Sequence, residues 1–310
     1  MIGLPKFVKV TEVGPRDGFQ MEKQFIPTEL KIEIVNALAR CGIRRMEVTS
    51  FVSPKAIPQM QDAAEVVAGI DRSLEVHLAA LVPNPKGAEN AVRARVDEIV
   101  VFLSASESHN RSNVNRTIKE SLDRFKSVLE VARAARIPVN GAIAVSFGCP
   151  FEGNVPPERV RGIVDRLLEL GVKGISLGDT TGMATPIIVN VLCELLLRAY
   201  PGIDLALHFH NTRGIGLVNV YHALQMGLTH FESSLAGMGG CPFAPGATGN
   251  ICTEDLVYML HELNIETGIN LPALLTVAKR TEQVVGRPLP GQVMKAGLRL
   301  DLHNTCQRGC

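Results

Sequence analysis

Short runs of β-branched and other apolar residues alternate with longer segments along this chain, at intervals of roughly thirty residues. In the longer segments apolar residues recur three and four positions apart, which is the period of an amphipathic helix. The short runs predict strands at Val8–Val13, Met46–Thr49, Val76–Ala80, Glu98–Phe102, Val139–Val145, Gly174–Leu177, Asp204–Phe209 and His230–Glu232. The longer segments predict helices such as Glu29–Arg40, Ile118–Ala135, Pro157–Leu170, Pro186–Ala199 and Leu217–Met226.

Eight parallel strands, each followed by a helix, close most readily into a (β/α)8 barrel, the TIM-barrel architecture. The first strand is not followed by a GxGxxG turn, which disfavours an open doubly wound sheet. Two further helical patterns, Thr253–Leu263 and Leu271–Val285, come after the eighth strand. We therefore predict one α/β domain over residues 1–310, with the barrel at about 6–265 and a C-terminal helical extension at about 266–310.

Charge and cysteine content narrow the functional class. Lysine plus arginine (32) nearly balance aspartate plus glutamate (31), so no strong basic field would hold a nucleic acid or an anionic membrane. The N-terminal segment lacks the pattern of a signal peptide, and no apolar run is long enough to span a bilayer. Seven cysteines without CxxC spacing disfavour a disulfide framework and a zinc ribbon. We expect a cytoplasmic protein that acts on a small molecule, with no nucleic-acid or membrane partner.

Polar residues at the ends of the predicted strands are the first candidates for chemistry, because catalytic groups of such barrels lie at the C-terminal ends of the strands. They are Arg16 and Asp17 after the first strand, Glu47 and Ser50 on the second, Asp179 and Thr180 after the sixth, and His208 and His210 at the seventh. The segment SASESHNRSNVNRT, which follows the fourth strand, is rich in hydroxyls and amides and fits a substrate-facing loop.

His208 and His210 are two positions apart on a strand and therefore project from the same face. Since strand eight closes against strand one, Asp17 and the loop after strand eight become their neighbours. An HxH pair alone is more often a structural feature, with each histidine hydrogen-bonded to its neighbours in the barrel. The carboxylate of Asp17 nearby favours a metal site instead. Two imidazoles, a carboxylate and the amide oxygen of Asn250 suit a divalent ion such as Mg²⁺, Mn²⁺ or Zn²⁺.

The other polar residues at the mouth have two readings each. Arg16 could form a surface ion pair, whereas beside a metal its permanent charge would face an oxyanion such as a developing enolate. Glu47 and Asp179 could act in chemistry, or could only satisfy arginine and backbone donors in a polar interior.

The loop AGMGGCPFAPGATGN, residues 236–250, contains five glycines and two prolines, so it forms no regular helix or strand. It places one thiol, Cys241, at its centre and Asn250 at its end. Its composition fits a lid that carries an acid over the site, and it fits equally well a flexible surface connection whose cysteine is incidental.

Six motifs in order, VGPRDGFQ, EVTSFVSPKAIPQM, SFGCPFEG, SLGDTTG, HFHNTRG and GMGGCPFAPGATGN, resemble those of the 3-hydroxy-3-methylglutaryl-CoA lyase family from Val13 to the tail. RDG, DTxG and HxH are shared with metal-dependent aldolases and Claisen-condensing synthases, whereas the glycine-rich loop and EVTSFVSPK favour the lyase branch. The resemblance implies a TIM barrel, a divalent metal, most readily Mg²⁺ or Mn²⁺, and a homodimer. It also implies cleavage of a 3-hydroxyacyl-CoA thioester to acetyl-CoA and a keto acid such as acetoacetate.

The resemblance also assigns roles by position. Metal ligands would be Asp17, His208, His210 and Asn250. Arg16 would meet the thioester oxygen and Cys241 would be the catalytic thiol. Glu47 and Asp179 match family residues near the substrate, and either His208 or Asp179 would be the base. We also expect Ser50, Thr180 and Arg213 to contact the substrate.

One departure leaves the exact substrate open. Typical members carry Asp-Thr-Tyr-Gly after the second histidine, where this chain has Asn211, Thr212, Arg213 and Gly214. Citramalyl-CoA or a longer-branched hydroxyglutaryl-CoA ester is therefore an alternative substrate, and a metal-dependent aldolase or condensing synthase is an alternative activity. The sequence assigns no role to Cys306 and Cys310.

Overall fold

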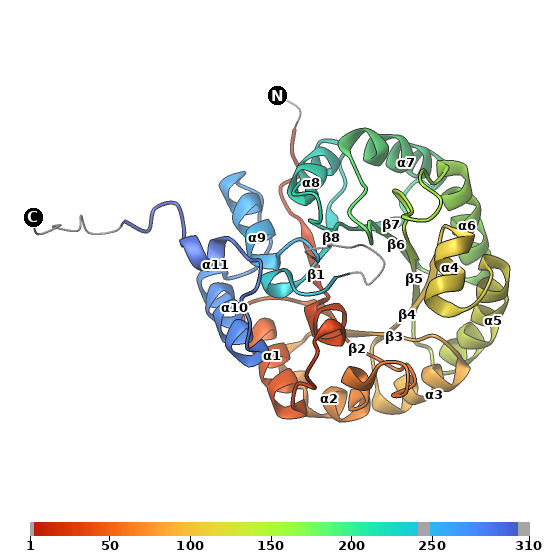
Figure 1. Ribbon diagram of the computed structural model, residues 1–310, viewed down its shortest axis with the longest axis horizontal. Helices are drawn as coiled ribbons and strands as arrows, with labels where there is room; N and C mark the ends of the chain where they lie inside the picture. Colours follow the sequence, from red (N-terminus) through yellow and green to blue (C-terminus); the bar gives the residue numbers. More distant parts are fainter. Residues whose placement is uncertain (1–2, 241–248, 303–310) are drawn as a thin grey trace, which may run out of the picture.

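The computed structural model describes residues 3–240 and 249–302. Eight parallel strands pair in chain order and close into one barrel with helices around it, so the predicted TIM-barrel fold is confirmed (Figure 1). Each predicted strand lies within two residues of an observed one. The strands are β1 Lys9–Glu12, β2 Arg45–Ser50, β3 His77–Leu81, β4 Glu98–Ser104, β5 Val139–Ala144, β6 Gly174–Gly178, β7 Asp204–His208 and β8 His230–Ser233.

The pairing of β1 with β8 closes the barrel. Lys9 pairs with His230 and Glu12 with Ser233, in parallel register. On the next pair, His208 of β7 lies opposite Glu232 of β8. Because all eight strands run in the same direction, their C-terminal ends form one rim, and the residues that follow them share one mouth.

Helices surround the barrel. The helices up to β8 are α1 Thr28–Arg40, α2 Ala63–Gly69, α3 Pro85–Ala94, α4 Glu107–Val114, α5 Ile118–Ala134, α6 Pro157–Leu170, α7 Pro186–Ala199 and α8 Gly216–Gln225. Two of them, α4 and α5, lie between β4 and β5 in the chain. Local signals set several ends: Thr117 and Glu120 form a capping box at the start of α5, and Gly171, with φ 98°, ends α6.

The segment after β4 differs from expectation. The sequence predicts a loop here, and this prediction is wrong for Glu107–Val114, which forms helix α4. The side chain of Ser106 accepts a hydrogen bond from the backbone N–H of His109 and so caps this helix. A polar segment without an apolar stripe gives no helical period, so the pattern of the sequence could not reveal it.

Three helices follow the barrel strands: α9 Thr253–Glu262, α10 Leu271–Val285 and α11 Val293–Ala296. Figure 1 shows α10 beside α1, so the chain returns to the start of the ring. The division of the chain at about residue 265 stays a prediction. Within residues 3–240 and 249–302, every helix is too short or too polar to span a bilayer.

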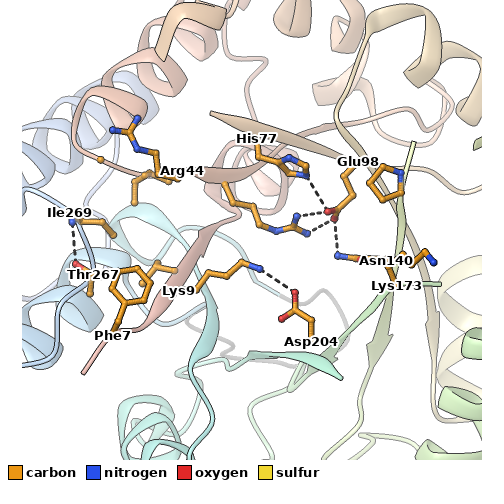
Figure 2. Close-up of a pocket in the computed structure, with 15 residues that line it drawn as sticks. Phe7, Lys9, Arg44, His77, Glu98, Asn140, Lys173, Asp204, Thr267 and Ile269 are labelled. Carbon is orange, nitrogen blue, oxygen red and sulfur yellow. Dashed lines mark hydrogen bonds and ion pairs between the residues drawn. The ribbon is translucent and has the colours of Figure 1, made fainter. Parts of the chain in front are cut away.

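The N-terminal end of the barrel carries a charged layer of its own. The guanidinium of Arg45 donates to both carboxylate oxygens of Glu98. Glu98 also forms a hydrogen bond with His77 Nε2, at 3.2 Å, and accepts one from Asn140 Nδ2, at 3.0 Å (Figure 2). A cavity of about 500 Å³ opens at this end. This layer fills the barrel interior near the N-terminal ends of the strands, at the opposite end from the mouth.

Replacement of Leu38 by alanine tests the packing of the ring on the barrel. Leu38 lies on the buried face of α1 and is fully buried, so Leu38→Ala should lower the free energy of unfolding by about 2–5 kcal/mol. The measurement is urea denaturation monitored by circular dichroism. Arg40→Ala, at an exposed position of the same helix, should stay within about 0.5 kcal/mol of the wild type. Equal effects of the two changes would contradict this packing.

Candidate active site

Four polar side chains from distant parts of the chain meet at the mouth. Asp17 lies in a π-helical turn, Gly14–Gly18, that follows β1 directly. His208 is the last residue of β7, and His210 pairs with Asn250 through an isolated antiparallel bridge. One ligand atom from each of Asp17, His208 and His210 lies within 4.8 Å of the others. The predicted convergence of these residues is therefore observed.

The geometry of this group fits a metal ion. Nε2 of His208 and Nε2 of His210 are 3.1 Å apart. Adjacent ligand atoms of an octahedral ion with bonds of about 2.1 Å are separated by roughly this distance. Asn250 donates from Nδ2 to Asp17 Oδ2 at 2.8 Å. His210 Nδ1 and Asn250 Oδ1 are buried and have no hydrogen-bond partner among the described residues.

Charge at the mouth also favours a cation. Arg16 donates from Nε to Glu47 Oε1 and from Nη1 to Asp17 Oδ1, both at 2.5 Å. Glu232 accepts a hydrogen bond from Nδ1–H of His208 at 3.0 Å. Burial would lower the pKa of His208, but the hydrogen bond to Glu232 raises it, so this ring shares the positive charge of the site with Arg16. An ion that displaced the proton of His208 would leave the three carboxylates of Asp17, Glu47 and Glu232 against one guanidinium, with two negative charges in excess. A divalent cation would balance them.

Burial and neighbouring charges set the protonation of the proposed ligands. Burial would raise the pKa of Asp17, but the charges of Arg16 and His208 hold it below its usual value, so Asp17 is ionised. Burial, reinforced by the neighbouring His208, lowers the pKa of His210 to about 3, so this imidazole is neutral. An ionised carboxylate and a neutral imidazole are the forms that bind metals.

A cavity of about 380 Å³ opens inside the mouth and has two unlike sides. The polar side contains six of the predicted site residues: Arg16, Asp17, Glu47, Thr180, His208 and His210. Strands β3 to β5, on the other side of the barrel, contribute the apolar side chains Leu81, Val100, Phe102 and Ala142, and α4 adds the polar His109 and Asn113. The cavity thus offers both ionic and hydrocarbon contacts.

Asp179 does not line this cavity. Its Oδ1 accepts hydrogen bonds from the backbone N–H groups of Met183 and Ala184, at 2.7 and 2.8 Å. Its Oδ2 is buried and unpartnered among the described residues, and burial raises the pKa of this carboxyl to about 7. One oxygen thus stabilises the turn that follows β6.

Two expected substrate contacts lie apart from the cavity. Ser50, at the end of β2, is fully buried and lines a different hollow. Arg213 donates from Nη1 to the backbone carbonyls of Thr181 and Gly182, at 2.9 and 2.7 Å. Arg213 therefore joins the loops after β6 and β7, and its contact with substrate stays a prediction. Cys241, Cys306 and Cys310 lie outside the described residues.

The sequence did not single out several polar residues that line the cavity: Gln20, Gln59, His109 and Asn113 of α4, Ser176 of β6 and Glu232 of β8. Glu232 could have been found, because it follows His230 by two positions and strand eight must border the histidine strand. His109 and Asn113 lie in SASESHNRSNVNRT, the segment expected to face the substrate, although its helix was not predicted.

A second group, Cys252, Glu254 and Asp255, also places three possible ligand atoms within 4.8 Å. It lies at the start of α9, where the positive end of the helix dipole disfavours a cation. Asp255 already accepts hydrogen bonds from the backbone of Gln292 and Val293. The mouth is therefore the better metal centre.

Known proteins resemble this chain over nearly its whole length. The family model described as HMGL-like matches residues 7–280. The hydroxymethylglutaryl-CoA lyase of Bacillus subtilis (strain 168) is 48% identical over 288 residues, or 93% of this chain and 96% of that protein. The mitochondrial hydroxymethylglutaryl-CoA lyase of Homo sapiens is 44% identical over 297 residues, or 96% of this chain and 91% of that protein.

A solved structure gives the same result. An HMG-CoA lyase from Acinetobacter baumannii, in complex with coenzyme A and 3-methylmalate, matches with a TM-score of 0.93 at 44% identity. The match covers 98% of this chain and 99% of that chain. The similarity therefore extends over the barrel and the helices that follow it.

Titration with Mn²⁺ tests the metal centre directly. His210→Ala removes one imidazole from the group, and we expect the dissociation constant for Mn²⁺ to rise by roughly a hundredfold or more, since loss of outer partners alone costs ten- to a hundredfold. Electron paramagnetic resonance of free Mn²⁺ measures this constant. His77→Ala removes an imidazole at the opposite end of the barrel and should leave it unchanged. Tight Mn²⁺ binding by His210→Ala would exclude His210 as a ligand.

Proposed function

The chain belongs to the hydroxymethylglutaryl-CoA lyase family, whose members are carbon–carbon lyases, and from this premise we propose its own reaction. It cleaves 3-hydroxy-3-methylglutaryl-CoA into acetyl-CoA and acetoacetate by a retro-Claisen reaction. The observation that carries the proposal is the meeting of Asp17, His208 and His210 with the guanidinium of Arg16 in one cavity. A cation site and an oxyanion partner, side by side, are what this reaction requires.

Enzymes of this family are metal-dependent, and the residues at the mouth fit that chemistry. We propose Mg²⁺ or Mn²⁺ as the ion, held by Asp17, His208, His210 and Asn250. When bound, such an ion lowers the pKa of a hydroxyl group and orients a neighbouring carboxylate. Oxygen and imidazole ligands together, without a thiolate among these four, are consistent with either ion.

The chain's own groups then move the proton and stabilise charge. A base takes the proton of the tertiary hydroxyl, the carbon–carbon bond breaks, and its electron pair forms the enolate of acetyl-CoA while the hydroxyl oxygen becomes the ketone of acetoacetate. Arg16 would stabilise the enolate oxygen. Two groups are candidates for the base. His208 lines the cavity, whereas Asp179 does not. Asp179 Oδ2 has no partner among the described residues, and burial raises the pKa of this carboxyl to about 7.

The enolate must finally receive a proton on carbon, and we assign this step to the thiol of Cys241. The assignment rests on the family resemblance of the glycine-rich loop and on two glycines near its start. Gly237 and Gly239 have φ of +68° and +106°, so the chain approaches Cys241 in conformations that favour glycine.

The departure at Asn211 and Arg213 bears on the acyl end of the substrate. Asn211 Oδ1 accepts a hydrogen bond from Gly216 N at 3.1 Å, and Arg213 donates to carbonyls, so both stabilise loops at the rim. These contacts give no reason to replace the proposed substrate. Citramalyl-CoA is the second candidate, and the relative solved with coenzyme A and 3-methylmalate supports a thioester partner in either case. A cytoplasmic homodimer completes the proposal.

Acetyl-CoA release from a panel of thioesters tests the reaction and the substrate together. With Mg²⁺, we expect turnover of 3-hydroxy-3-methylglutaryl-CoA to exceed that of citramalyl-CoA, and chelation with EDTA should abolish both, because the proposed proton transfer needs an acidified hydroxyl. Added Mn²⁺ should restore activity. Activity that survives full chelation, or cleavage of citramalyl-CoA alone, would refute the proposal as stated.

Cys241→Ser tests the proton donor. We expect kcat to fall by roughly a hundredfold or more, as is usual when a general acid is removed, while Mn²⁺ binding stays that of the wild type. Cys149→Ser is the matched control, because Cys149 is fully buried and lies outside the mouth cavity. Unchanged turnover by Cys241→Ser would rule out this role.

A further inference from the structure

Glu12, the last residue of β1, is fully buried beneath the mouth. Its Oε1 accepts hydrogen bonds from Gly14 N at 2.7 Å and from Leu235 N at 2.8 Å. Its Oε2 accepts a hydrogen bond from Thr253 Oγ1 at 2.6 Å. One carboxylate thus joins three segments that are separated by up to 241 residues in the chain.

Each of these segments leads to a proposed metal ligand. Gly14 begins the turn that carries Asp17. Leu235 begins a short turn, Leu235–Gly237, and the carbonyl of the next residue, Met238, accepts a hydrogen bond from Asn250 at 2.9 Å. On the other side of Asn250, Thr253 begins α9.

The same segments are in close backbone contact, so their spacing leaves little slack. A Cβ atom on Gly239 would lie 2.5 Å from Asn250 Nδ2 and 3.2 Å from Asp17 Oδ2. A Cβ on Gly18 would lie 2.7 Å from Met238 Cβ. The Asp17 turn and the Asn250 segment therefore touch only because glycine is present at the contact.

We propose that Glu12 is a positioning residue for the metal centre, which sets the separation of Asp17 from Asn250 through its bonds to Gly14, Leu235 and Thr253. Glu12 contacts neither substrate nor ion. The inference rests on the proposed metal site. It adds to that site a residue that does not line the mouth cavity.

The chemistry of the three donors explains why a carboxylate is needed. Two backbone N–H groups and a hydroxyl point at Glu12, and an ionised carboxylate is the one side chain of this size that only accepts. An amide would turn an N–H toward one donor and leave it unsatisfied in a buried place. Glu12 has no ion-pair partner in the part of the chain that the structure describes, so these hydrogen bonds alone offset its burial. Burial raises its pKa to about 7, so tests are best made at pH 8, where it is ionised.

Glu12→Gln, nearly equal in shape, is the decisive variant. We expect its dissociation constant for Mn²⁺ to rise about tenfold or more, the cost usual for outer partners of metal ligands. We expect kcat to fall while KM for the thioester changes little, because Glu12 does not touch it. Glu98→Gln is the matched control, since Glu98 is another buried carboxylate, 4% exposed, at the opposite end of the barrel (Figure 2). That variant should lose stability without a change in Mn²⁺ affinity.

A second pair of variants tests the same proposal if Glu12→Gln folds poorly. Thr253→Val removes one of the three donors and should weaken Mn²⁺ binding, whereas Thr253→Ser keeps the hydroxyl and should restore the wild-type value. The proposal would be overturned if Glu12→Gln folds and binds Mn²⁺ with wild-type affinity. If Glu12→Gln does not fold, the same result for folded Thr253→Val would overturn it. A wild-type protein that binds Mn²⁺ but cleaves no thioester would overturn the proposed function and leave this inference standing, while a wild type that binds no Mn²⁺ would overturn both.

Discussion

The parallel pairing of β1 with β8 is the constraint on which the site depends. It brings Glu12 opposite Ser233, and so places the turn that carries Asp17 against the chain that leaves the last strand. His208 reaches the same mouth because β7 adjoins β8. Without closure, these groups would lie at opposite edges of an open sheet, and no cation could contact all of them.

Closure also concentrates charge, which the protein manages in two separate layers. At the mouth, Arg16 is shared by Asp17 and Glu47, and the remaining negative charge is left for a cation. At the other end, Arg45 forms an ion pair with Glu98, which also contacts His77 and Asn140. The barrel thus holds two separate groups of buried charge, one at each end.

The fold and much of the site could be predicted because each rests on a local period or on strand order. Short apolar runs located all eight strands, and two-residue spacing placed His208 beside His210. Contacts set by loop geometry could not be predicted: the bonds of Arg213 to neighbouring carbonyls depend on how two loops approach each other. The role of Glu12 was hidden for the same reason, since its three donors come from segments whose meeting only the folded chain defines.

The two unlike sides of the mouth cavity have a stereochemical consequence. A tertiary carbon that bears a hydroxyl, a carboxymethyl arm, a thioester arm and a methyl group is a chiral centre. If its oxygens faced Asp17 and Arg16 and its methyl group faced Val100 and Phe102, only one mirror image could also direct the thioester outward. Such contacts would select the handedness of the substrate without a residue dedicated to it.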